Sequence, residues 1–281
     1  MAKAALTRET AAPDAGALPD IHLALRGVSH TYPARAAQGP VPALGSLDLE
    51  FRRGEFVGVV GPSGCGKSTL LEIIAGLVTP TSGTIEMEGR DITGTVADEI
   101  GVVFQEDATF AWLNVWDNVA FGLRRAGTDG AEIARRVDEV LAFMGLTGFR
   151  GAYPAQLSGG MRQRVCIART LVLRPRLILL DEPFGALDQQ TRLLMGEELL
   201  RLWRETGATV MLITHALDEA ALLSDRVAVM SARPGRLIDI VTTGWPRERD
   251  STLVADPTFG TLTGRLWALL REESKKALGI S

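Results

Sequence analysis

The stretch "FVGVVGPSGCGKST", residues 56–69, constrains the fold of this chain most strongly. Phe56 to Val60 is a continuous apolar run, which is typical of a strand buried within a parallel sheet. The following residues match G-x-x-x-x-G-K-[ST] in full, and a helix is expected to begin at Lys67. The strand before the loop and the helix after it distinguish this loop from a chance glycine-rich turn. The sequence therefore predicts an α/β domain with a phosphate-binding loop.

The loop residues point to a nucleotide bound with Mg²⁺. Glycines let the backbone turn its N–H groups toward phosphate oxygens. Lys67 offers a charge to the β- and γ-phosphates, and Ser68 offers a hydroxyl to Mg²⁺. Cys65 has small neighbours and is expected to be a spacer. The expected nucleotide-binding residues here are Gly61, Pro62, Ser63, Gly64, Cys65, Gly66, Lys67, Ser68 and Thr69.

A second acidic motif, "LILLDEP", ends a predicted strand with Asp181 and Glu182. Open α/β sheets bind ligands at the carboxyl ends of their strands. Adjacent buried carboxylates are costly unless a cation or phosphate chemistry uses them. We expect Asp181 to hold Mg²⁺ and Glu182 to orient or deprotonate the attacking water. The alternative is a solvated acidic turn before Pro183.

Two further polar residues follow apolar runs. His215 ends "TVMLITH", and we expect it to contact the γ-phosphate, with a purely structural histidine as the alternative. Gln105 follows the apolar "GVVF" and is a candidate to contact Mg²⁺ or water. With Lys67 and Glu182, His215 completes the expected catalytic set.

The sequence around the motifs predicts an insertion and an extension. Helical stretches dominate from about 91 to 163, which predicts a helical subdomain inserted into an α/β core. Residues 1–20 are rich in Ala, Pro, Thr and Asp and are predicted to be disordered. Residues 241–281 form a C-terminal extension, with a helix predicted over 257–278. Its apolar stripe favours docking on its own domain, and a membrane-surface helix is the alternative.

Composition limits the partners and the compartment. A net charge of −4 gives no bulk attraction to nucleic acid. Two cysteines make no disulfide framework and fit a reducing compartment. No apolar run approaches the ~20 residues that span a bilayer, so any membrane link is expected to run through a partner.

The stretch "LSGGMRQR", residues 157–164, resembles a second anion site. A serine and two glycines stand where a helix is expected to start, and free N–H groups at a helix N-terminus favour anions. The chain already has one phosphate loop. A second anion site at Ser158, Gly159 and Gly160 therefore needs a separate explanation.

Together these motifs resemble the ATP-binding subunit of ABC transporters. The phosphate loop, "LSGGMRQR", "LILLDEP", "GALD" and "ITH" occur in that family's order, between about Ile21 and Met230. The resemblance implies an ABC-type ATP-binding domain over residues 21–240. It has a P-loop NTPase core with a mainly parallel sheet, an antiparallel β subdomain and an inserted helical subdomain.

The resemblance also implies roles for single residues. Tyr32 would stack on adenine, with a core aromatic as the alternative, and Gln105 would sense Mg²⁺ and the transport partner. Two subunits of this family pair head to tail, so Ser158 and the N–H groups near Gly159 and Gly160 would approach the other subunit's γ-phosphate. Asp188 of "GALD" would join the two halves of that dimer.

A narrower resemblance is to the importer branch for nitrate, sulfonate, taurine and related solutes. It rests on "LSGGMRQR", "DEPFGALD", "VMSARPGR" and "WLNVWDNVAFGL". It implies a membrane permease, indirectly a solute-binding protein, and a place on the cytoplasmic face of the inner membrane. The chain departs from the branch where Phe110, Ala111 and Trp112 replace a Leu-Pro-Trp stretch, at the expected permease contact. Packing within the helical subdomain is the alternative role for these aromatics.

Two other functions remain as alternatives. A non-transport ABC-type ATPase acting on nucleic acid or ribosomes typically has two nucleotide domains or a long coiled coil, and this sequence has neither. A P-loop kinase or GTPase is disfavoured by "LSGGMRQR" and His215. The transported solute is not specified by any residue of this chain.

Overall fold

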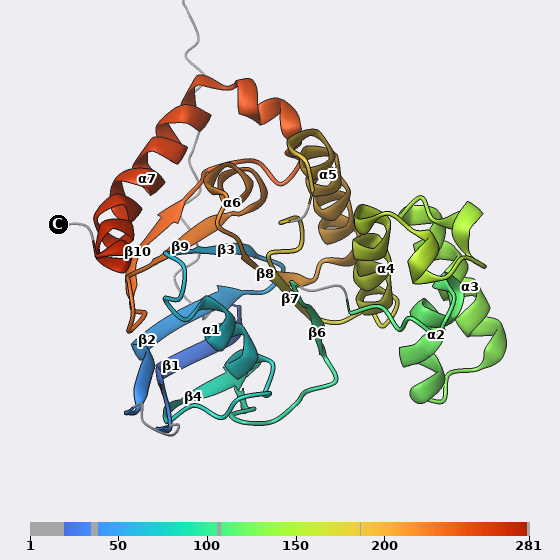
Figure 1. Ribbon diagram of the computed structural model, residues 1–281, viewed down its shortest axis with the longest axis horizontal. Coiled ribbons are helices and arrows are strands. Elements are labelled where there is room, and N and C mark those ends of the chain that lie inside the picture. The colour runs from blue at the N-terminus through green and yellow to red at the C-terminus, as the bar shows by residue number, and fades with distance from the viewer. Residues whose placement is uncertain (1–19, 35–38, 106–107, 186, 280–281) are drawn as a thin grey trace, which may run out of the picture.

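The computed structural model describes residues 20–34, 39–105, 108–185 and 187–279. Apart from Asp20, the predicted disordered segment 1–20 lies outside these ranges. The described chain forms two sheets, with helices between them and on the far face of the larger one (Figure 1).

The smaller sheet is antiparallel and has the strand order β2-β1-β4-β5. Its strands are β1 (Ile21–Tyr32), β2 (Val41–Arg52), β4 (Ser82–Met87) and β5 (Arg90–Asp91). β2 alternates in burial: Leu47, Leu49 and Phe51 are buried while Asp48 is exposed. A period of two places apolar side chains on one face of a sheet, so this sheet buries one face against the rest of the domain.

The larger sheet has the order β10-β9-β3-β8-β7-β6. Its strands are β3 (Phe56–Val60), β6 (Ile100–Val103), β7 (Leu177–Asp181), β8 (Thr209–Ile213), β9 (Arg226–Met230) and β10 (Leu237–Thr242). All neighbours are parallel except β10, which runs antiparallel to β9. The predicted fold class is confirmed: a mainly parallel sheet, an antiparallel β subdomain and a helical subdomain.

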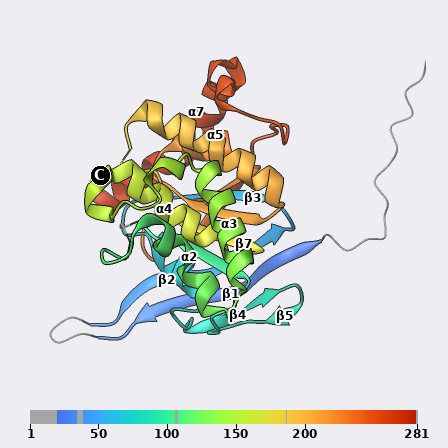
Figure 2. The same ribbon diagram turned by 90° about the vertical axis from the view of Figure 1, so that its right-hand side faces the viewer.

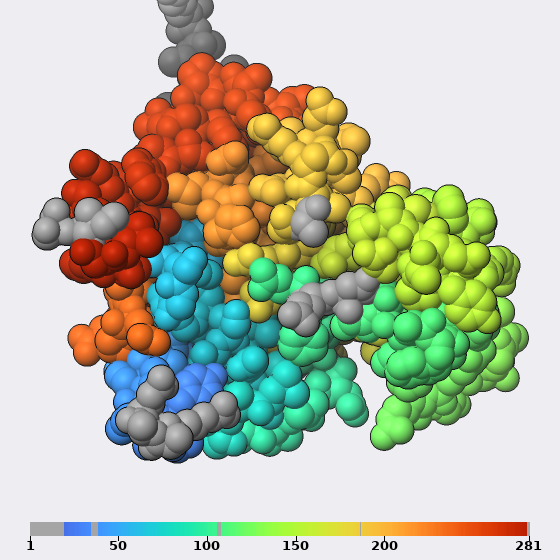
Figure 3. All heavy atoms as spheres, viewed as in Figure 1, coloured from blue at the N-terminus to red at the C-terminus, as the bar shows by residue number. Residues whose placement is uncertain are grey.

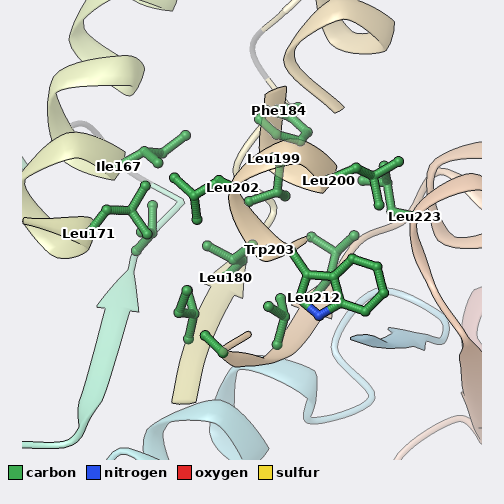
Figure 4. Packing of buried hydrophobic residues seen from close by; sticks show 14 of the residues in the cluster. Ile167, Leu171, Leu180, Phe184, Leu199, Leu200, Leu202, Trp203, Leu212 and Leu223 are labelled. Atoms are coloured by element: carbon green, nitrogen blue, oxygen red, sulfur yellow. The ribbon is translucent and has the colours of Figure 1, made fainter. Parts of the chain in front are cut away.

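The larger sheet separates two hydrophobic cores. Leu177 and Leu179 of β7 face the helix α1 (Lys67–Ile74) and the inner face of the smaller sheet. Ile178 and Leu180 face the opposite core. There they meet α4 (Gly159–Leu171) and α5 (Gln189–Thr206), where Leu180 packs near Trp203 (Figure 4). Burial on both faces explains why these strands are continuous apolar runs.

The helical subdomain projects beside the sheets (Figures 2 and 3). It contains α2 (Val115–Arg125), α3 (Gly130–Phe143), the short 3₁₀ turns Thr147–Phe149 and Pro154–Gln156, and the start of α4. The predicted span of about 91–163 differs from the structure at its beginning. β6 lies inside that span, yet it pairs in parallel with β7 in the larger sheet, because its short apolar run is buried there.

The C-terminal extension packs on the domain. After β10 it forms a 3₁₀ turn (Ser251–Ala255) and α7 (Pro257–Leu278), which has the predicted bounds. Phe259, Leu266 and Leu270 of the predicted stripe are buried in the core shared with α6 (Leu217–Leu223). The docked terminal helix is therefore the observed arrangement.

Candidate functional site

An open cleft of about 650 Å³ lies where β3 and β8 end and β7 gives way to Glu182. Carboxyl ends of parallel strands meet at one edge of a sheet, and ligands of such sheets bind there. The cleft contains most of the predicted loop together with the residues after β6, β7 and β8. It is lined by Tyr32, Val41, Ala43, Ser63, Gly64, Gly66, Lys67, Ser68, Thr69, Gln105, Glu182, His215 and Arg233.

The loop after β3 is shaped by positive backbone angles that favour glycine. Gly64 has φ +72° and Gly66 has φ +105°, and a Cβ on Gly66 would lie 2.8 Å from the Ala43 carbonyl oxygen. Lys67 is the first residue of α1, and its Nζ donates to the Gly61 oxygen at 2.8 Å and to the Pro62 oxygen at 3.1 Å. The ammonium is thus held beside the loop backbone, where a phosphate would sit.

Three predicted loop residues are not among those that line the cleft. Gly61 and Pro62 contribute carbonyl oxygens to Lys67 instead. The Cys65 side chain is buried in the core between the sheets, which agrees with its expected role as a spacer. Burial raises the pKa of the Cys65 thiol, so the group is unlike a reactive thiolate.

A buried carboxylate lies directly behind the loop. Asp181 ends β7, is 7% exposed, and receives a hydrogen bond from the Ser68 hydroxyl. Burial, reinforced by the charge of Glu182, raises the pKa of the Asp181 carboxyl, while Ser68 and Lys67 oppose that shift. The structure therefore brings together two of the oxygen donors predicted to hold Mg²⁺.

Glu182 joins two predicted site residues. Its Oε2 accepts a hydrogen bond from Gln105 Nε2 at 3.2 Å and lies 3.1 Å from His215 Nδ1. Its backbone has φ +47°, an uncommon value for a residue other than glycine. Its backbone N–H donates to the Ile213 oxygen at 2.9 Å, which holds the turn. The solvated acidic turn considered as an alternative does not describe this connected arrangement.

Tyr32 is the last residue of β1 and also lines the cleft. Its hydroxyl is 3.2 Å from Thr69 Oγ1, and its ring packs edge-on against His30 at 4.5 Å between centroids. The side chain is half-buried. Tyr32 thus combines a packing contact with a place in the cleft wall.

Ser158, Gly159 and Gly160 of "LSGGMRQR", here called the signature residues, are described by the structure but are not among the residues that line the cleft. Ser158 is exposed and caps α4 by accepting from the Met161 N–H at 3.3 Å. Gly159 and Gly160 open that helix, so their N–H groups have no intrahelical acceptor. Gly159 is also exposed. The arrangement can bind an anion that arrives from outside this protomer.

Asp188 has a structural role in the protomer. Its two carboxylate oxygens accept from the Thr191 N–H at 3.0 Å and the Thr191 hydroxyl at 2.7 Å, which caps α5. These hydrogen bonds lower the pKa of the Asp188 carboxyl. It does not line the cleft, and Ala186 of the same motif lies outside the described residues.

Sequence reasoning missed three residues of the cleft wall. Val41 and Ala43 come from the start of β2, and Arg233 comes from the turn between β9 and β10. The only signal for Arg233 was the stretch "VMSARPGR", which supported the resemblance to the importer branch and was not predicted to be part of a site. Long-range contact between that turn and β2 places Arg233 here.

None of the helices within the described ranges combines the length and hydropathy required to cross a membrane. Likewise, the described part of the chain has no group of three or more His, Cys, Asp or Glu side chains arranged to hold a metal ion.

Comparison with known families gives one match, to the family model described as "ABC transporter", over residues 44–185. That range begins in β2 and ends just after Glu182, so it spans the phosphate loop, the signature and both acidic residues.

Several similar proteins have names that state an import function. The taurine import ATP-binding protein TauB of Pelagibacter ubique is 50% identical over 197 residues, which cover 70% of this chain and 74% of that protein. The nitrate import ATP-binding protein NrtD of Synechocystis sp. is 41% identical over 257 residues, which cover 89% of this chain and 96% of that protein.

The fold also matches a solved structure of a dimer. The structure of a post-hydrolysis state of an ATP-binding cassette bound to ADP and Pi superposes with a TM-score of 0.70 at 33% sequence identity. The match covers 80% of this chain and 100% of that chain.

Proposed function

The chain belongs to the ABC transporter family, and from this premise we propose that it is the ATP-hydrolysing subunit that powers import of a small solute through a separate membrane permease. The observation that carries the proposal is the cleft in which Lys67, Glu182 and His215 meet. Import is favoured because similar proteins over most of the chain are named for taurine or nitrate import. Taurine is itself a sulfonate, so other sulfonates are included among the candidate solutes.

ATP binding follows from the lining of the cleft. The loop from Gly61 to Thr69 would surround the phosphates with N–H groups, and Lys67 would shift from its carbonyl partners to the β- and γ-phosphates. Tyr32, which also lines the cleft, would stack on adenine. Its hydroxyl contact with Thr69 connects the base-binding wall to α1.

The residues behind the loop fit Mg²⁺. Ser68 and Asp181 present a hydroxyl and a buried carboxylate in contact with each other, and Gln105 adds an amide oxygen nearby. Mg²⁺ prefers oxygen ligands and takes one or two from protein when phosphates supply others. The raised pKa of Asp181 indicates a carboxylate that a cation would stabilise. When bound, the ion would neutralise charge on the phosphates.

Hydrolysis would use Glu182 and His215. The Glu182 carboxylate lies in the cleft wall, where it can accept a proton from an attacking water or orient that water. Because a carboxylate only accepts hydrogen bonds, His215 Nδ1 carries a hydrogen toward Glu182 and leaves Nε2 free for other partners. Gln105 holds the same carboxylate oxygen from the side of β6.

A second copy of the chain would complete the site. Ser158, Gly159 and Gly160 are outside their own protomer's cleft and present open N–H groups. In a head-to-tail pair these groups would meet the γ-phosphate held by the partner, and Asp188 would lie at the junction. Support comes from the dimeric cassette that this chain resembles at 33% identity.

The membrane partner would contact the helical subdomain. Trp112 is 74% exposed, and its ring lies 5.4 Å from that of Phe110, which in turn packs 4.6 Å from Phe121. Exposed clustered aromatics mark protein interfaces. Through that permease the chain would lie on the cytoplasmic face of the inner membrane, and a solute-binding protein would act with the complex only indirectly. No nucleic acid is expected in this assembly.

Reconstitution tests the function. The chain is purified with its co-encoded permease, placed in proteoliposomes, and assayed for ATP hydrolysis with taurine, other sulfonates or nitrate and the matching binding protein. We expect solute-stimulated hydrolysis and uptake that Glu182→Gln abolishes. Failure to copurify with any permease, together with retention of RNA or ribosomes at physiological salt, would instead support a non-transport ATPase.

A further inference from the structure

The turn between β9 and β10, residues 231–236, is fastened to the start of β2. The Gly235 N–H donates to the Ala43 oxygen at 2.9 Å, and the Gly45 N–H donates to the Gly235 oxygen at 2.9 Å. Ala43 itself lines the nucleotide cleft. These reciprocal bonds connect two segments that are far apart in sequence, so the turn holds a fixed place at the cleft.

The same turn touches the phosphate loop directly. A Cβ on Gly235 would lie 2.1 Å from the Cys65 carbonyl oxygen, and 2.8 Å from the Met230 methyl. Both distances are too short for any side chain, and the first involves backbone that cannot move aside. Gly235 is therefore packed against the loop backbone, which fixes the 231–236 turn relative to the phosphate loop.

Arg233 is carried into the cleft by this turn. Its side chain is exposed and lines the cavity, and it has no hydrogen bond or ion pair with another described residue. Among the described residues that line the cleft, Arg233 and Lys67 are the two that are lysine or arginine. ATP carries several negative charges on its phosphates, and the ammonium of Lys67 together with one Mg²⁺ would not balance all of them.

The C-terminal extension holds the other side of the turn. Glu273 of α7 accepts a hydrogen bond from the Ala232 N–H at 2.8 Å, and its side chain is only 15% exposed. α7 extends along the domain to this turn (Figure 1). The Glu273 contact is thus one residue away from Arg233, which connects the extension to the nucleotide cleft.

We propose that Arg233 is a second cation for the phosphates of the nucleotide and that Glu273 is its positioning residue, so α7 sets nucleotide affinity. The proposal rests on the proposed function, because it assumes that ATP occupies the cleft. It gives the C-terminal extension a role that packing alone would not require.

Titration calorimetry with ATP tests the cation. We expect Arg233→Gln to raise the Kd for ATP by about tenfold, which is the lower end of the range for losing one charge-assisted hydrogen bond, because Arg233 is exposed. Arg233→Lys should recover most of the affinity. The matched control is Arg236→Gln, which removes a neighbouring exposed arginine that is not among the cleft-lining residues.

The outcomes separate this inference from the proposed function. Wild-type protein that fails to bind ATP would defeat the proposed function itself. Normal ATP binding by the wild type and by Arg233→Gln alike would overturn only the role of Arg233. Loss of affinity that Arg233→Lys does not recover would also overturn it, because a charge contact with phosphate tolerates lysine.

A second set of variants tests the positioning role. We expect Glu273→Ala to raise the Kd for ATP by about two- to fivefold, since the turn loses one hydrogen bond. Glu273→Gln keeps an acceptor oxygen and should bind as the wild type does. Glu272→Ala is the control, because Glu272 pairs with Lys275 on the solvent side of the same helix.

The double variant Arg233→Gln/Glu273→Ala decides how Glu273 acts. If Glu273 works through Arg233, the double variant binds ATP no more weakly than Arg233→Gln alone. Additive losses, or a Glu273→Ala variant with lower thermal stability and unchanged ATP affinity, would assign Glu273 a structural role and overturn the proposal.

Discussion

The imidazole Nδ1 of His215 lies 3.1 Å from the Oε2 of Glu182. The two residues follow neighbouring strands, β8 and β7, so the larger sheet itself sets their separation. Glu182 holds its carboxylate there with a positive φ, a conformation that costs of order 1 kcal/mol or more for a residue with a side chain. We therefore expect Glu182 and His215 to act together, which a double variant tests.

If Glu182 and His215 act as one unit, their substitutions are not additive. We expect Glu182→Gln to reduce kcat for ATP hydrolysis by about a hundredfold or more while the Kd for ATP changes little, because the group acts on water. His215→Ala should also reduce kcat, and the double variant should be about as slow as the slower single variant. Steady-state phosphate release measures all three, and multiplicative losses would contradict the coupling.

A mixing experiment tests whether the anion site at Ser158, Gly159 and Gly160 contacts the nucleotide held by the partner subunit. Lys67→Ala and a bulky replacement, Ser158→Arg, should each be inactive alone, because every composite site carries one defect. In a mixed dimer both defects fall on the same site and the other site is intact. An equimolar mixture should recover about a quarter of wild-type turnover if one intact site suffices. A mixture as inactive as either variant alone would contradict the head-to-tail pair.

Much of the central fold was predictable because its signals are local. The apolar run of β3 has the predicted bounds, and α7 begins at Pro257 and ends at Leu278 as its apolar stripe indicated. Strand, loop and helix appear in order around the phosphate loop, so the placement of Lys67 and Ser68 followed. Glu182 and His215 were predicted because strand ends of a parallel sheet meet at one edge.

The features that were missed depend on pairing between distant segments. β6 is four residues long, and such a short run carries too little periodicity to distinguish a strand from the start of a helical region. Arg233 enters the cleft only because Gly235 pairs with Ala43 and Gly45, far away in sequence. Neither pairing is encoded in local composition, and both emerge only from the assembled sheet.

Buried Glu219 should make stability depend on pH. Burial raises its pKa to about 7, while the Thr214 hydroxyl, which donates to it at 2.9 Å, opposes the shift. Between about pH 4.5 and 7 the unfolded chain has lost this proton and the folded chain keeps it, so stability falls as pH rises. At about 1.4 kcal/mol per pKa unit, the loss is of the order of 3 kcal/mol.

Glu219→Gln removes this titration. We expect its urea unfolding free energy to fall less than that of the wild type between pH 5 and pH 8, and to exceed it at pH 8. The control is Asp218→Asn, which changes the exposed neighbour and should keep the wild-type slope. If the unfolding free energies of wild type and Glu219→Gln changed equally with pH, another group would determine the pH dependence of stability in this range.

Arg249 anchors the C-terminal extension, and its removal should destabilise the fold. The residue is 2% exposed, and its guanidinium donates to Asp225 at 2.7 Å and to the Leu223 oxygen at 2.5 Å. Asp225 also accepts from the Phe56 N–H, so the contact reaches the first residue of β3. Arg249→Ala leaves Asp225 without its cation and should lower the unfolding free energy by about 3 kcal/mol.

Arg247→Ala is the matched control for Arg249. Arg247 stacks on Trp203 at 4.1 Å, as Arg249 does at 4.7 Å, but it is exposed. An exposed cation–π contact contributes about 0.5–1 kcal/mol, so this variant should unfold close to the wild type in urea. Equal urea midpoints for the two variants would contradict the assignment, because a buried guanidinium paired with Asp225 is the feature that distinguishes Arg249 from its neighbour.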